Sequence, residues 1–317
     1  MTSAWETSIS STEAADPLGI QLYTVQRELL HDLAGTLKTL RQIGYSQVEP
    51  SGMLGRTPRE FKDALDAAGL AVPSAHILSG PAQDAMVDLA TGRLTANEAW
   101  KKARAAMDLA NIEPIMAEMF EQQSILGNEY LVLALDLDLR RSPDAIDRVA
   151  KAFNQAGQLC HDRGLRFAWH PHLDYGRVAE ESTFDRILQA TDPTLVSVEL
   201  DFFWASASKA DIPQLLQHYG DRLRLGHVKD MAQSVVVPPG GFTDINTLPP
   251  DIHADVGCGQ IDYDALIPRA QTAGMRYFFV EHDFAPHPID SARRAYSVCR
   301  RVQQHRATPD TFTINLI

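Results

Sequence analysis

Apolar runs of five to seven residues recur along the chain, and each is followed by a longer stretch with the period of an amphipathic helix. The runs predict strands at 18–23, 46–50, 71–76, 130–135, 165–170, 196–201, 223–228 and 276–282. Helix signals lie between them. Thr57 and Pro58 are typical of a helix start, and Gly44 and Gly69 of helix ends. The region 95–126 is predicted to be helical, with a break near Pro114.

Strict alternation of strand and helix favours a parallel sheet, and eight such units predict a closed (β/α)8 TIM barrel of the α/β class. We expect a single barrel domain over residues 18–305, with a flexible N-terminal arm at 1–17 and a tail at 306–317. The seventh strand is followed by a long Pro/Gly-rich loop, residues 231–256. Structureless loops longer than about 12–15 residues are often lids, so this one is predicted to cover the substrate or the site of a neighbouring subunit.

The carboxyl ends of the predicted strands carry the candidate chemistry, because that end of a TIM barrel holds the active site. Side chains along a strand alternate between the barrel interior and the helix layer. In "FAWHPH", Ala168 therefore points inward with His170, Trp169 points to the helices, and His172 continues the inward direction. The last inward positions of strands five to eight are His170, Asp201, His227 and Glu281.

Two imidazoles and two carboxylates on adjacent strands form a donor set for a divalent metal, for which Mn²⁺ is the first choice and Mg²⁺, Co²⁺, Fe²⁺ or Zn²⁺ are alternatives. Taken singly, each residue is more simply explained as a hydrogen-bonding group in a polar loop. Lys229 would stabilise an enolate oxygen, or else form an ion pair with Asp230. Trp204 offers an aromatic wall for a sugar. Glu199 and Arg166 are expected to pair inside the barrel.

Order, spacing and motifs then indicate a family. The chain resembles the xylose-isomerase-like TIM-barrel superfamily, in particular the sugar phosphate isomerase/epimerase group, through "GIQLYTVQREL", "WHPH", "ELDFFWA", "GHVKDM", "DVGCGQIDYDAL" and "YFFVEHD". The resemblance implies a metal held by the four strand-end residues named above, and substrate contacts from Gln21, Glu49 and His76. One position departs from the pattern: His170 stands where many members have a glutamate, although a subgroup with a His-Asn-His motif is similar.

The predicted function is a metal-dependent sugar isomerase or epimerase that acts on a keto-sugar or related polyol through an enediolate. Glu281 would exchange the proton on the carbon next to the carbonyl, with His172 or Lys229 as the acid. The predicted substrate-binding residues are Gln21, Glu49, His76, His172, Trp204 and Lys229. A lyase or hydratase acting on keto-sugars or keto-glycosides is the alternative, and a non-catalytic sugar-binding barrel is an alternative of another class.

The charge and composition of the chain limit the classes of binding partner that we expect. The formal net charge of −12 disfavours nucleic acid, and with it an endonuclease-IV-like repair enzyme on the same fold. Three cysteines without CxxC spacing disfavour disulfides and thiolate metal sites. No apolar stretch is long enough for a membrane span, and the first residues lack a signal-peptide pattern. We therefore expect a cytoplasmic enzyme with a small carbohydrate substrate, and a homo-oligomer as one option; an export signal already removed would leave no trace.

Overall fold

Eight parallel strands form the barrel of the computed structural model, which describes residues 18–134, 143–175, 177–178 and 181–305. Their order in the sheet is β2-β1-β12-β9-β8-β5-β4-β3. Barrel strands that are consecutive in the sequence therefore lie side by side, and the first strand, β1, pairs with the last, β12. Their bounds are β1 Leu18–Gln21, β2 Gln47–Glu49, β3 Ser74–His76, β4 Tyr130–Leu133, β5 Arg166–Trp169, β8 Val196–Asp201, β9 Leu223–Val228 and β12 Tyr277–Val280. Backbone bonds from Val48 N to Ala71 O (2.9 Å) and from His76 N to Pro50 O (2.9 Å) join β2 to the segment that carries β3. The predicted TIM barrel is thus confirmed.

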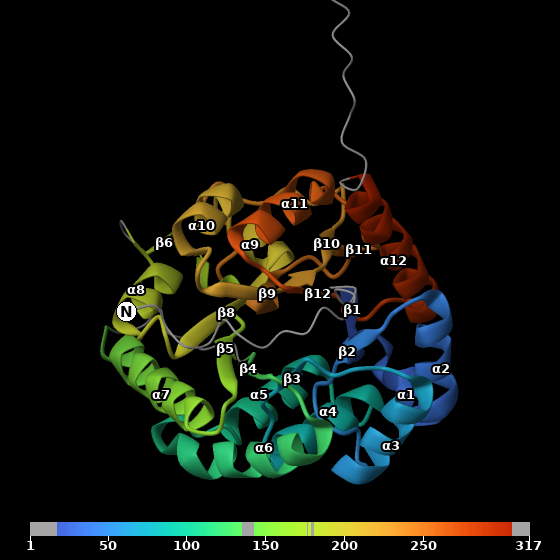
Figure 1. The fold of residues 1–317 in the computed structure, drawn as a ribbon. Coiled ribbons are helices and arrows are strands. Elements are labelled where there is room, and N and C mark those ends of the chain that lie inside the picture. Colours follow the sequence, from blue (N-terminus) through green and yellow to red (C-terminus); the bar gives the residue numbers. More distant parts are fainter. Residues whose placement is uncertain (1–17, 135–142, 176, 179–180, 306–317) are drawn as a thin grey trace, which may run out of the picture.

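Helices surround the barrel (Figure 1). Their bounds are α1 Gln26–His31, α2 Leu33–Ile43, α3 Pro58–Ala68, α4 Gly80–Ala90, α5 Ala96–Ala105, α6 Ile112–Leu126, α7 Pro143–His161, α8 Thr183–Ala190, α9 Phe202–Ala207, α10 Ile212–Tyr219, α11 Tyr263–Ala273 and α12 Pro288–His305. Short 3-10 turns are η1 Leu22–Val25, η2 Leu109–Asn111, η4 Leu173–Tyr175 and η5 Ile245–Thr247, and two-residue strands are β6 Arg177–Val178, β7 Glu181–Ser182, β10 Asp230–Met231 and β11 His253–Ala254.

Local chemistry explains most helix ends. Thr57 and Glu60 form a reciprocal capping box at the start of α3, and Gly69 ends that helix with a left-handed φ of 69°. The predicted break near Pro114 is confirmed, a few residues earlier in the chain. The α-helix is interrupted between α5 and α6, and Pro114 lies in the first turn of α6, where its missing N–H would have no helical partner anyway.

The predicted direction of the strand side chains is confirmed. Tyr130, Val132, Ala168, Leu225 and Phe279 form a separate apolar cluster inside the barrel. The alternate positions pack outward in the larger core between strands and helices. There Trp169 lies 5.6 Å from Phe153 of α7 and 5.6 Å from Phe184 of α8, ring centre to ring centre. Toward the carboxyl ends of the strands, the inward side chains that follow this apolar cluster are the polar residues of the site.

The long loop after β9 leaves and returns as an antiparallel pair, β10 with β11. Asp230 holds the end of the long loop in place. Its carboxylate accepts hydrogen bonds from the backbone of Met231 (2.8 Å), Gly257 (2.9 Å), Gly259 (3.0 Å) and Ile261 (3.1 Å). The predicted arm at 1–17 and tail at 306–317 lie outside the described residues, so the domain division remains a prediction. No helix in the described part of the chain is both long and apolar enough to cross a bilayer.

Candidate active site and metal centre

A cavity of about 330 Å³ opens at the carboxyl ends of the strands. Its polar wall comes from the ends of β3, β5, β9 and β12 and the loops that follow them, and comprises His76, His170, His172, Lys229, Glu281 and Asp283. Trp204 of α9 and Ile245 and Leu248 of the long loop also line it. The loop therefore reaches the cavity, as expected of a cover. Of the predicted site residues, Gln21, Glu49, Asp201 and His227 do not line the cavity but are completely buried beside it.

The four predicted metal ligands converge. His227 Nδ1 lies 2.8 Å from Glu281 Oε2 and 3.9 Å from Asp201 Oδ2, and His170 Nε2 lies 3.8 Å from the same Asp201 oxygen. Asp201 Oδ2 is a buried atom that makes no hydrogen bond with the described residues. Buried polar atoms are rarely left without a partner. This oxygen, with the nitrogen and oxygen ligand atoms of His227 and Glu281 around it, fits a divalent cation.

Asp201 is held for this role by the helix that follows it. Its Oδ1 accepts hydrogen bonds from the backbone of Phe203 (2.7 Å) and Trp204 (3.0 Å), and thereby caps α9. That bonding fixes the carboxylate and leaves Oδ2 turned toward His170 and His227. Helix α9 was not predicted from the sequence, although an aspartate followed by an apolar helix-forming segment is its signal.

Lys229 is the buried cation of the site. Its Nζ lies 2.9 Å from Glu281 Oε2, 3.0 Å from Asp283 Oδ2 and 3.5 Å from Asp201 Oδ2. The alternative ion pair with Asp230 is wrong, because the Asp230 carboxylate is bonded to the backbone of the long loop. Asp283 was not proposed as a site residue, yet it shares the inward direction of Glu281 two residues earlier, and that spacing was the available signal.

A second group of polar side chains lies deeper in the barrel. Glu49 Oε1 accepts a hydrogen bond from Gln21 Nε2 (2.9 Å) and lies 2.8 Å from His227 Nε2 and 3.0 Å from His76 Nε2, while Ser74 donates to its other oxygen. Glu199 Oε2 lies 3.0–3.2 Å from His170 Nδ1, His76 Nε2 and His227 Nε2.

The predicted Glu199–Arg166 pair is therefore wrong. Arg166 lies at the opposite end of β5, where its Nε lies 3.1 Å from Glu129. Glu199 instead meets histidines from three other strands, and joins them in a second group of metal-ligand type, His76, His170, Glu199 and His227.

The charges of the site follow from these contacts. Burial opposes ionisation of Glu281, but Lys229 and His227 outweigh it and hold the pKa of that carboxyl well below its usual range. Burial likewise opposes the charge of Lys229, but Asp283, Glu281 and Asp201 raise its pKa well above the ordinary value. Both groups are charged at neutral pH. Burial, reinforced by Lys229, lowers the pKa of His172 to about 3, so that its imidazole is neutral.

In the deeper group, the pKa values of two carboxyl groups shift in opposite directions. Burial and the nearby Glu49 carboxylate raise the pKa of Glu199 to about 7. Burial opposes protonation of His76, but Glu49 and Glu199 outweigh it and raise its pKa to about 9. Glu49 keeps a pKa below the ordinary range, because His76 and His227 outweigh the cost of its burial. Glu49 is thus the fixed negative charge of the deeper group.

His172 and Trp204 both line the cavity, and each has a buried polar atom without a hydrogen bond in the described part of the chain. His172 Nδ1 and Trp204 Nε1 are buried and make no hydrogen bond with the described residues, and the two rings lie 5.1 Å apart in an edge-to-face arrangement. The backbone N–H of His172 donates to Asp174 Oδ2 (3.2 Å) and helps to fix the residue. These atoms are placed to bind a polar ligand.

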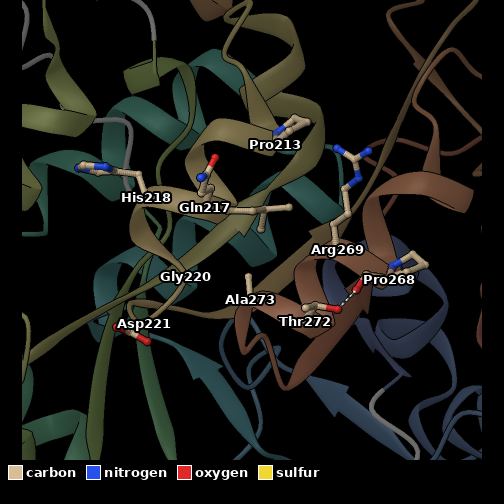
Figure 2. A pocket seen from close by; sticks show the side chains of 10 residues that line it. Pro213, Gln217, His218, Gly220, Asp221, Pro268, Arg269, Thr272 and Ala273 are labelled. Atoms are coloured by element: carbon tan, nitrogen blue, oxygen red, sulfur yellow. Dashed lines mark hydrogen bonds between the residues drawn. The ribbon is translucent and has the colours of Figure 1, made fainter.

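A larger groove elsewhere has none of these features. Figure 2 shows it between α10 and α11, with a volume of about 540 Å³. Its charged or titratable side chains are exposed, namely His218, Asp221 and Arg269. The Thr272 hydroxyl donates a hydrogen bond to Pro268 O of its own helix (2.8 Å). Because water already solvates these groups, the groove has no buried charge for a ligand to neutralise.

Comparison with known families agrees with the barrel and its strand-end site. A family model described as a xylose isomerase-like TIM barrel matches residues 37–302. The chain belongs to this family. Solved structures similar to this chain include a sugar phosphate isomerase/epimerase from Parabacteroides distasonis, which is 20% identical with a TM-score of 0.65 over 92% of this chain and 95% of that one. The IolI protein, solved with a bound zinc atom, is 15% identical with a TM-score of 0.60 over 92% and 97%.

Curated relatives match only part of the chain. The inosose dehydratase of Lactiplantibacillus plantarum is 35% identical over 88 residues, which are 28% of this chain and 29% of that protein. The inosose dehydratase of Halalkalibacterium halodurans is 28% identical over 153 residues, 46% of this chain and 50% of that protein. The chain thus spans half or less of the length of these relatives. Family and fold together place the chain in a family of carbohydrate-metabolising enzymes.

Proposed function

We propose that this chain is a metal-dependent lyase that removes water from a cyclic keto-polyol or keto-sugar. The observation that carries the proposal is His170. An epimerase that works with two carboxylates removes a proton on one face of the substrate and delivers one on the other, whereas here the ligand position of the fifth strand carries an imidazole. Elimination and isomerisation require only one such base. The local matches to inosose dehydratases support elimination.

Asp201, His227 and Glu281 would hold the metal, with His170 as the fourth donor. When bound, a divalent cation supplies Lewis-acid polarisation of the carbonyl and of an adjacent hydroxyl. Mn²⁺ is the first choice for this oxygen- and nitrogen-rich set. Lys229, held beside Glu281 and Asp283, contributes a fixed positive charge where the carbonyl oxygen gains negative charge.

His172 would move the proton. Its Nδ1 has no partner among the described residues and its side chain lines the cavity, whereas Glu281 Oε2 already contacts His227 and Lys229. His172 takes the proton from the carbon next to the carbonyl, and the electron pair of that C–H bond forms the enediolate. When the C–O bond at the next carbon breaks, the imidazolium returns its proton to the leaving hydroxyl, which departs as water.

The other predicted substrate contacts divide into two roles. His76 lines the cavity and is proposed to contact the substrate, as are Trp204 and Lys229. Gln21 and Glu49 are fully buried and bonded to each other, so we assign them to positioning His76 and His227. A homo-oligomer remains a prediction.

Isomerisation or epimerisation is the second candidate. It is favoured by the carboxylates of Glu281 and Asp283, which both line the cavity beside Lys229 and would each accept a proton. Both reactions share the first proton transfer with elimination, so the product must distinguish them.

The test is a panel of cyclic keto-polyols and keto-sugars incubated with Mn²⁺ and the protein in D₂O. Mass spectrometry of the products is expected to show loss of one water. A product of unchanged composition, with deuterium on carbon, would instead establish the second candidate. If no compound of the panel reacts or exchanges a carbon-bound proton, the enzymatic proposal fails. Metal-stripped protein is the control.

A further inference from the structure

The cavity has two chemically different walls. One is the polar wall of strand-end residues described above. The other is apolar and comes from η1, α4, α5, the long loop and the segment after β12; we call it the apolar wall, and it comprises Tyr23, Met86, Trp100, Ile245, Leu248 and Phe284. The polar residues of these segments that line the cavity, Asn97, Arg104 and Asn246, are exposed to solvent.

Three aromatic rings form the centre of the apolar wall. The Tyr23 ring lies 6.3 Å from that of Trp100 and 6.1 Å, edge to face, from that of Phe284. Phe284 is 54% exposed, and it has a left-handed φ of 56°, a conformation that is rare for a bulky residue. An exposed aromatic side chain in an unfavourable backbone conformation at a cavity wall points to a binding function.

A polyol ring alone does not account for both walls. Its hydroxyl groups require hydrogen-bonding partners once they leave water, and His172 Nδ1, Trp204 Nε1 and Lys229 Nζ supply them on the polar wall. On the apolar wall only the Tyr23 hydroxyl and the Trp100 indole N–H are polar side-chain groups, and the other four side chains are hydrocarbon or thioether. The cavity volume of about 330 Å³ also falls within the range of about 300–1,000 Å³ that is typical of pockets for drug-sized ligands.

We propose that the apolar wall is a subsite for an apolar group attached to the sugar, so that the preferred substrate is a keto-glycoside with an aromatic or branched hydrocarbon aglycone. The inference rests on the proposed function for the sugar end of the cavity. Aromatic rings at edge-to-face distances bind a flat apolar group well, because its area leaves water and ring contacts add to that gain.

The test compares two substrates that differ only in the aglycone, the methyl and phenyl β-glucosides oxidised to a ketone at carbon 3. The phenyl compound is expected to have a kcat/KM roughly tenfold higher. Trp100→Ala and Leu248→Ala should each bring the ratio of the two kcat/KM values closer to one. Val236→Ala is the matched control: Val236 is 86% exposed on the same loop and does not line the cavity, so both rates should stay unchanged.

A binding measurement separates this inference from the proposed function. Calorimetric titration with the unoxidised methyl and phenyl glucosides requires no turnover and should show tighter binding of the phenyl compound, reduced by Trp100→Ala. If the protein converts unsubstituted keto-sugars as efficiently as the phenyl ketone, or binds both glucosides equally, the subsite is overturned while the lyase proposal stands. If it binds the phenyl glucoside preferentially but converts no ketone, the lyase proposal fails and the subsite stands.

Discussion

Two groups of buried polar residues lie one above the other in this barrel, and they differ in how fully they are bonded. The cavity group, Asp201, His172, Lys229, Glu281 and Asp283, retains buried atoms without hydrogen bonds, namely Asp201 Oδ2 and His172 Nδ1. In the floor group, Gln21, Glu49, Ser74, His76 and Glu199, the Glu49 carboxylate contacts four side chains. Glu199 Oε1 of the floor group also makes no hydrogen bond with the described residues, so the contrast is between single carboxylates. Asp201 keeps an oxygen available to a ligand, whereas Glu49 has both oxygens bonded and positions its neighbours.

His227 connects the two groups. Its Nδ1 faces Asp201 and Glu281 in the cavity group, and its Nε2 faces Glu49 in the floor group. A metal-binding imidazole usually donates its other N–H to a carboxylate, which fixes the tautomer and the ring orientation. The floor group also reaches the cavity through His170, whose Nδ1 lies 3.0 Å from Glu199 Oε2, and through His76, which lines the cavity. Three substitutions test how the two groups divide their roles, and the first has the largest expected effect.

Asp201→Asn should cause the largest loss. The amide oxygen can still cap α9, but the negative charge toward the metal position is removed, so the fold is expected to remain while metal affinity collapses. Because metal Lewis acidity supplies several kcal/mol of transition-state stabilisation, kcat/KM should fall by about 10³-fold or more. Metal analysis of the purified protein and thermal melting would check this: excess metal at about 100 times its Kd stabilises the native state by about 2.7 kcal/mol.

The matched control is Asp211→Asn. Asp211 caps α10 through Gln214 N (2.9 Å) just as Asp201 caps α9, but it is exposed and lies away from the cavity. It should leave metal content and activity unchanged. If Asp201→Asn retains full metal content and the full metal-dependent rise in Tm, the proposed centre is wrong.

The sequence predicts the strands and their inward positions because both depend on local periodicity. The direction of Ala168, His170 and Trp169 follows from alternation alone, and so does the meeting of four strand ends. Partners across the barrel do not follow from it. Alternation places Glu199 inside, but not against histidines of three other strands. The Lys229–Asp230 pair contradicts alternation itself, since adjacent residues of an extended strand point to opposite faces.

The apolar wall of the cavity was not predictable in the same way. Trp100 is on a helix outside the barrel, Leu248 is in an irregular loop and Phe284 follows the last strand, so no periodicity relates them. Their meeting is decided by how α5 and the long loop pack over the barrel mouth. The break between α5 and α6 lies a few residues before the predicted position, because a proline in the first turn of a helix resembles a proline that interrupts one.

His172→Asn should have the next largest effect and tests the proton transfer within the cavity group. Asparagine preserves a polar side chain of similar length but cannot accept the proton, so kcat should fall by about 10²–10³-fold while metal content stays near that of the unmodified protein. Exchange of the substrate's carbon-bound proton in D₂O, followed by NMR, measures the step directly.

Glu281→Gln sharpens this experiment, since Glu281 is the base predicted from the sequence alone. As a proposed metal ligand it should lose metal as well as exchange. If instead Glu281→Gln retains metal and loses exchange, while His172→Asn exchanges at the normal rate, then Glu281 is the base and His172 is not.

Glu49→Gln should have the smallest effect of the three, and it tests whether the floor group acts through His227. Glutamine can place its oxygen toward Gln21 and His227 and its amide toward Ser74, so the shape of the floor group is preserved and only the charge is lost. Removal of such a carboxylate partner typically lowers metal affinity 10–100-fold. We expect the Kd for metal to rise by that factor, with kcat at saturating metal falling by a smaller one.

Ser74→Ala provides the comparison, because it removes one hydrogen bond but leaves the charge beside His227. Its metal Kd should change less than that of Glu49→Gln. A purely structural role for Glu49 would lower Tm in both variants and leave the metal Kd of the folded protein unchanged. That result would mean that the floor group has no influence on metal binding in the cavity group.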